Sequence, residues 1–117
     1  MTDDSWIADA SAVLARLQSD EPPTRDEQRS AVKAALAALV DRAPGRSVEV
    51  RVPPFAAVQV VEGSRHRRGT PPAVVETDAA TWLALALGEL GWADAVRSGR
   101  LRASGERSDL SALLPLI

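Results

Sequence analysis

The chain of 117 residues has no cysteine, no tyrosine and a single histidine. Without cysteine it can form no disulfide, no thiol nucleophile and no thiolate metal site. No apolar run approaches the roughly 18 residues that a membrane-spanning helix needs. The first ten residues, MTDDSWIADA, are acidic and lack the features of a secretory signal. We therefore expect a cytoplasmic protein without a transmembrane segment.

Aromatic side chains make up only 3% of the chain, and the formal net charge is −2. Nucleic-acid binders usually carry a basic patch with exposed aromatic groups, so this composition argues against that class. The charge is unevenly placed, since residues 1–41 hold 8 acidic and 4 basic residues and residues 42–117 hold 8 acidic and 10 basic ones. The acidic first part and the slightly basic second part can attract each other.

The first 44 residues predict two helices. Apolar residues recur along one face of the first helix, at Ile7, Ala10, Leu14 and Leu17. A Pro-Pro pair then interrupts the helical pattern. Thr24 and Glu27 have the spacing of a capping box, which predicts the start of a second helix. The apolar stripe of that helix consists of Ala31, Val32, Ala35, Leu36, Leu39 and Val40.

Four later segments have the extended, half-apolar patterns of strands: residues 47–52, 55–62, 73–77 and 100–104. An antiparallel meander is the simplest connection for the first three, and the fourth strand arrives after intervening helices. We predict one α+β fold, a twisted, antiparallel-rich sheet of four to five strands covered by helices. In this division residues 1–44 form an acidic helical leader and residues 45–117 form the α+β domain.

The stretch from Glu76 to Gly105 has an ordered set of signals. Asp78 can cap an apolar helix that Gly88 ends, and a shorter helix follows until Gly99. A short strand comes next. The leucine-rich end, DLSALLPLI, predicts a last helix that stops near Leu114 because proline follows it.

This order of signals resembles the sterol carrier protein 2 (SCP2) family, in its compact bacterial version with a helical leader. The residues that carry the resemblance are Asp78, Trp82, Leu85, Gly88, Ala95, Gly99, Leu101, Gly105, Leu110, Leu113 and Leu114. The resemblance implies a twisted sheet covered by helices, with an apolar tunnel between the layers for sterols, fatty acyl chains or acyl-CoA. It implies no catalytic residue and no cofactor.

The helix from Ala79 to Leu87 has almost no polar face, so it is either buried core or part of a cavity wall. If a tunnel exists, the candidates for its wall are Phe55, Val58, Val60, Val74, Trp82, Leu85, Leu101 and Leu113. Plain core packing is the alternative for each of them.

A basic loop lies between Gly63 and Gly69. Its candidates for contact with an anion or a membrane surface are Arg65, His66, Arg67 and Arg68. The alternative is a solvated loop. His66 has no acidic neighbour in the sequence, which disfavours a catalytic role. A metal site is equally disfavoured, because one histidine and scattered carboxylates make a poor ligand set.

The favoured function is therefore a non-enzymatic carrier that binds a hydrophobic small molecule, such as a fatty acyl chain, acyl-CoA or an isoprenoid, between sheet and helices. The alternative is an accessory protein-interaction module with a solid core and no lipid ligand. The partners left open are a lipid or acyl-CoA ligand, a protein partner and a second copy of the chain.

Overall fold

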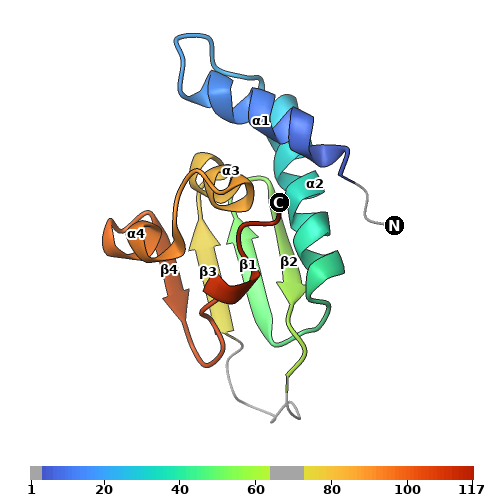
Figure 1. Cartoon of the computed structure of the whole chain (residues 1–117), viewed down its shortest axis with the longest axis vertical. Coiled ribbons are helices and arrows are strands. Elements are labelled where there is room, and N and C mark those ends of the chain that lie inside the picture. The colour runs from blue at the N-terminus through green and yellow to red at the C-terminus, as the bar shows by residue number, and fades with distance from the viewer. Residues whose placement is uncertain (1–3, 64–72) are drawn as a thin grey trace.

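The computed structural model describes residues 4–63 and 73–117, which form a four-stranded sheet with its helices (Figure 1). In chain order the elements are α1 (Trp6–Leu17), α2 (Arg25–Arg42), β1 (Val48–Val52), β2 (Ala56–Val60), β3 (Ala73–Thr77), α3 (Ala79–Leu87), α4 (Trp92–Arg97), β4 (Leu101–Ser104) and the short 3-10 helix η1 (Ser111–Leu113). The predicted α+β class and both helices of the first 44 residues are confirmed.

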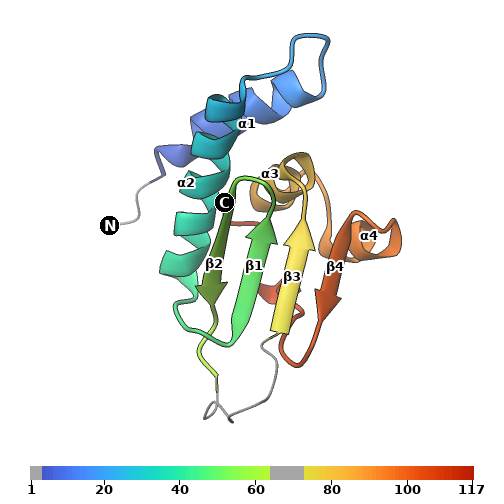
Figure 2. The ribbon, with the colours of Figure 1, turned by 180° about the vertical axis from the view of Figure 1, so that it is seen from behind.

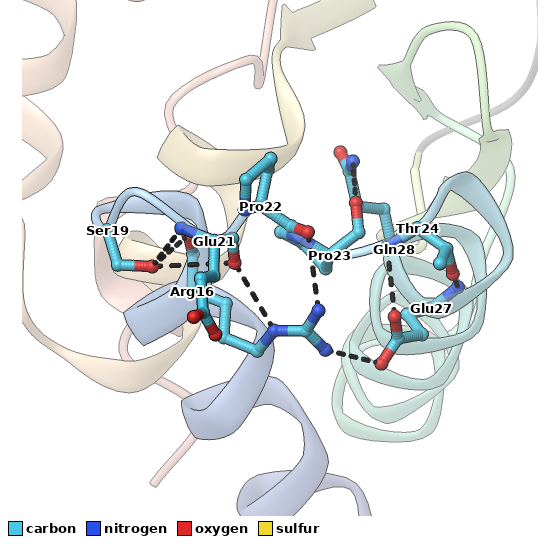
Figure 3. Close-up of polar contacts among 8 residues, drawn as sticks. All are labelled: Arg16, Ser19, Glu21, Pro22, Pro23, Thr24, Glu27 and Gln28. Carbon is cyan, nitrogen blue, oxygen red and sulfur yellow. Dashed lines mark hydrogen bonds and ion pairs between the residues drawn. The ribbon is translucent and has the colours of Figure 1, made fainter.

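The helical hairpin of α1 and α2 is fixed by its connection (Figure 3). The predicted capping box is present: the N–H of Glu27 donates to Thr24 Oγ1 at 3.1 Å, and the N–H of Thr24 donates to Glu27 Oε1 at 2.9 Å. Arg16, at the end of α1, donates to Glu27 Oε2 at 2.7 Å and to the carbonyl oxygen of Pro22 at 3.3 Å. One guanidinium therefore ties the end of α1 to the start of α2.

Helix α1 packs on α2 and α3. Its buried residues are Trp6, Ala10, Val13 and Leu14. The predicted apolar face is thus right for Ala10 and Leu14, whereas Ile7 and Leu17 are only half-buried. Trp6 and Val13 also belong to the buried face, because α1 packs on two helices, α2 and α3.

The sheet has the strand order β2-β1-β3-β4. β1 pairs antiparallel with β2 and parallel with β3, and β3 pairs antiparallel with β4. The predicted meander is therefore wrong, because β3 adds to β1 rather than to β2. β2 returns the chain along β1, so β3 can begin at the end of the sheet where β1 begins and run parallel to it.

The two faces of the sheet differ in chemistry. The inner face is apolar and faces α3 and the C-terminal segment; Val48, Val50 and Val52 of β1 are all at most 1% exposed. Figure 2 shows the outer face, with α3 and the C-terminal segment behind the strands. Across the outer face the register aligns Arg51 with Glu76 and Glu76 with Arg102, a row of alternating charge.

Helix α3 forms where its caps predict. Asp78 Oδ1 accepts the N–H of Thr81 at 2.8 Å, and Gly88 ends the helix with φ +82°, a left-handed conformation that favours glycine. Every residue of α3 except Ala80 is buried, so α3 is a core helix.

The C-terminal segment departs from the predicted helix. Only the single turn η1 forms, because proline at 115 keeps Leu114 extended, with ψ 145°. The segment instead runs across the inner face of the sheet (Figure 1) and is held by Arg42 of α2, which donates to the carbonyl oxygens of Leu113, Pro115 and Leu116 at 2.8–3.0 Å. The N–H of Leu116 also donates to the carbonyl oxygen of Ala86 in α3, at 2.9 Å.

Candidate functional site

The candidate site is the apolar layer between the inner face of the sheet, α3 and the C-terminal segment. Seven of the eight predicted wall residues belong to one hydrophobic core: Phe55, Val58, Val60, Trp82, Leu85, Leu101 and Leu113. Four of these side chains are at most 3% exposed, and Phe55, Val58 and Leu113 are half-buried at its border. Segments distant in sequence thus supply one continuous apolar surface.

Val74 does not belong to this surface. The register pairs it with Glu49 of β1 and Ser104 of β4, both on the outer face. Neighbouring residues of a strand point to opposite faces, so Val75 rather than Val74 faces the core, and it is 2% exposed. The prediction that Val74 lines the wall is therefore wrong, because Val75 and not Val74 lies on the same face as Val58.

Other residues of the layer were missed by the prediction. The inner-face valines of β1, Val75 of β3 and the C-terminal Leu110 and Leu116 are all buried against the same core. The strict alternation of Val48, Val50 and Val52 in the sequence was a sufficient signal for β1. No local signal identified Leu116, because its burial depends on the contacts of the C-terminal segment with Arg42 and α3.

The apolar layer is electrically neutral. Among residues 4–63 and 73–117, no charged side chain is buried, and the buried polar residues are Thr77 and Thr81. Thr77 Oγ1 donates to the carbonyl oxygen of Arg100 at 2.8 Å. The indole nitrogen of Trp82 is the one fully buried side-chain polar atom without a hydrogen-bond partner in this described part of the chain.

Among the described residues, the acids and bases with shifted pKa values lie outside this layer. Backbone hydrogen bonds to Thr24 and Ser111 hold the pKa values of Glu27 and Asp109, respectively, below their usual range. The hydrogen bond to Glu49 raises the pKa of Arg51. All three groups are exposed, so these shifts belong to the capping box of α2, to the turn before η1 and to the outer sheet face rather than to a catalytic centre.

The predicted anion-contact residues Arg65, His66, Arg67 and Arg68 lie outside the described residues. Within the described ranges, no three histidine, aspartate or glutamate side chains gather as a metal site would require. None of the described helices is long and apolar enough to cross a membrane.

Comparison with known proteins adds one finding. Residues 24–116, which are 93 of the 117, match the family model described as "Bacterial SCP ortholog", where SCP abbreviates sterol carrier protein. The match begins at the capping box of α2 and ends within the C-terminal segment, so it includes every element of the apolar layer. A search of curated proteins finds no match.

Proposed function

Since the chain belongs to the family of bacterial sterol carrier protein orthologs, we propose that it is a non-enzymatic carrier. It binds one hydrophobic small molecule, a fatty acyl chain, acyl-CoA or an isoprenoid, between the sheet and the helices. The observation that carries this proposal is the neutral, continuous apolar layer between β1–β4 and α3. The ligand enters where the half-buried border residues Phe55, Val58 and Leu113 meet the surface.

The energetics of such a site favour a long chain. Burying a methylene gains about 0.8 kcal/mol, so about sixteen methylenes gain about 13 kcal/mol. Association and ordering of the ligand oppose this by at least about 4–5 kcal/mol. The remaining 8 kcal/mol corresponds to a dissociation constant of about 1 µM, which suits a carrier that must also release its ligand.

Two features support binding without catalysis. The buried polar groups of the described layer are hydroxyls and one indole N–H, and none of them is an activated nucleophile or a base. The sequence also places Arg65, Arg67 and Arg68 in one loop, and in this proposal they hold the phosphates of an acyl-CoA or an anionic membrane surface.

The test uses a fluorescent fatty acyl probe and two variants with the same added indole. Leu85 is 1% exposed in the layer, whereas Val96 is 44% exposed on α4. Leu85→Trp fills the layer, so it should weaken probe binding at least about tenfold, since an overfilled core has no room for the chain. Val96→Trp should bind like the wild type. If Leu85→Trp does not fold, as judged by circular dichroism, Leu85→Phe replaces it.

The alternative function is an accessory module that contacts another protein. The observation in its favour is the outer sheet face, where Arg51, Glu76 and Arg102 form a charged row that α3 and the C-terminal segment leave uncovered (Figure 2). If the wild-type protein binds no fatty acyl chain, acyl-CoA or isoprenoid at concentrations of about 100 µM, well above the micromolar range expected of a carrier, the accessory module replaces the carrier.

A further inference from the structure

The indole N–H of Trp82 is a donor without an acceptor. The side chain is 2% exposed, and no hydrogen-bond partner for Nε1 exists among the residues that the structure describes. Indole nitrogen can only donate, and a buried tryptophan usually finds an acceptor for it. Most buried polar groups in proteins are paired, so an exception calls for a physical reason.

Two polar side chains near Trp82 in the sequence, those of Asp78 and Thr77, already make hydrogen bonds within the fold. Asp78 Oδ1 accepts the N–H of Thr81 as the cap of α3. Thr77 uses its hydroxyl hydrogen on the carbonyl oxygen of Arg100. Trp82 belongs to the same core as Leu85, which lies one helical turn after it in α3. The indole N–H is therefore a neutral donor in the apolar layer that has no acceptor among the described residues.

We propose that Nε1 of Trp82 donates to an oxygen of the bound ligand, an inference that rests on the carrier function proposed above. The ligand class follows from charge. No charged side chain of the described chain is buried in this layer, and one neutral donor cannot offset the desolvation of a carboxylate. The buried end of the ligand is therefore a neutral alcohol or carbonyl oxygen on an apolar body, rather than a carboxylate.

The experiment compares four ligands with ten carbons each: decane, decan-1-ol, decan-2-one and decanoate at pH 7. The chain has three tryptophans, so its nitrogen-15 NMR spectrum contains three indole N–H signals. The single variants Trp6→Phe, Trp82→Phe and Trp92→Phe assign them. We expect decan-1-ol and decan-2-one to move the Trp82 signal downfield, as a new hydrogen bond does, and decane to leave it without such a shift.

Affinities provide the second readout. Trp82→Phe removes the donor and keeps an aromatic ring, so it should weaken the alcohol and the ketone roughly 3- to 10-fold, the worth of one neutral hydrogen bond. Decane should bind both forms equally. Trp92→Phe is the control, because Trp92 is half-buried on α4, outside the proposed wall, and it should change none of the affinities.

Three results would overturn the inference. Equal binding of decane and decan-1-ol without a Trp82 shift would refute the donor role and leave the carrier function standing. Tight binding of decanoate with a Trp82 shift would refute the neutral class of ligand. Failure of all four ligands, and of longer acyl chains, would remove the carrier function together with the inference. If Trp82→Phe does not fold, the wild-type shifts still decide, because the other two variants assign the third signal.

Discussion

Replacing Gly45 by alanine should destabilise the fold far more than the same change at Gly99. Gly45 has φ +152°, and a Cβ there would lie 2.1 Å from the carbonyl carbon and oxygen of Val61. Real Cβ contacts are essentially never shorter than 3.0 Å, so the backbone must move by about 0.9 Å, the difference between 3.0 and 2.1 Å. Val61 is held there by three hydrogen bonds: its N–H donates to Ala43 O at 2.7 Å, and the N–H and hydroxyl of Ser47 donate to its carbonyl oxygen at 3.0 and 2.6 Å. Losing them at about 1 kcal/mol each gives about 3 kcal/mol.

The assay is urea unfolding followed by circular dichroism, with thermal unfolding as a second measure. A loss of about 3 kcal/mol should lower the melting temperature by roughly 10–15 °C in a chain of this size. Gly99 is the matched control, because it also has positive φ, +78°, but no atom lies within 4 Å of an added Cβ. Gly99→Ala should therefore lose only about 1–2 kcal/mol, from the left-handed backbone alone. Equal losses in the two variants would refute the close contact between Gly45 and Val61.

Two further predictions concern the helical hairpin. The pKa of Glu27 is lowered in the folded state, chiefly by the backbone N–H of Thr24, so its contribution to stability is full above the unfolded pKa and is lost as the pH falls through the folded pKa. In urea unfolding from pH 7 to about pH 3, Glu27→Gln should therefore lose less stability than the wild type below about pH 5; parallel curves would contradict this. Deletions test the predicted boundary after residue 44. Because α2 buries five apolar residues, deletion of residues 1–44 should destabilise the chain by several kcal/mol more than deletion of residues 1–23. A stable fragment 45–117 would instead establish that boundary.

The sequence predicted those parts of the fold in which the interacting residues are close together in the chain. The capping box joins Thr24 and Glu27, and the cap of α3 joins Asp78 and Thr81, so each is visible within four residues. The alternation of valine with polar residues likewise predicted β1, because the inner-face valines follow the two-residue period of a strand.

Features that depend on distant partners were not predictable in this way. Strand alternation says which residues share a face, but it does not say that β3 pairs with β1, so the meander was wrong. Val74 and Val75 are the same residue type, and only the register decides which one faces the core. The C-terminal segment looked helical from its leucine spacing, yet its position is set by Arg42, whose guanidinium contacts carbonyl oxygens more than seventy positions away in the chain.

The carrier function is tested most directly by native mass spectrometry of the full chain, purified without organic solvent and then incubated with a fatty acid, an acyl-CoA and an isoprenoid alcohol. We expect a one-to-one complex with at least one of these molecules, either already present after purification or formed on incubation. This complex should be lost in Leu85→Trp and kept in Val96→Trp. A mass of 12.4 kDa without any bound molecule, before and after incubation, would contradict the carrier function.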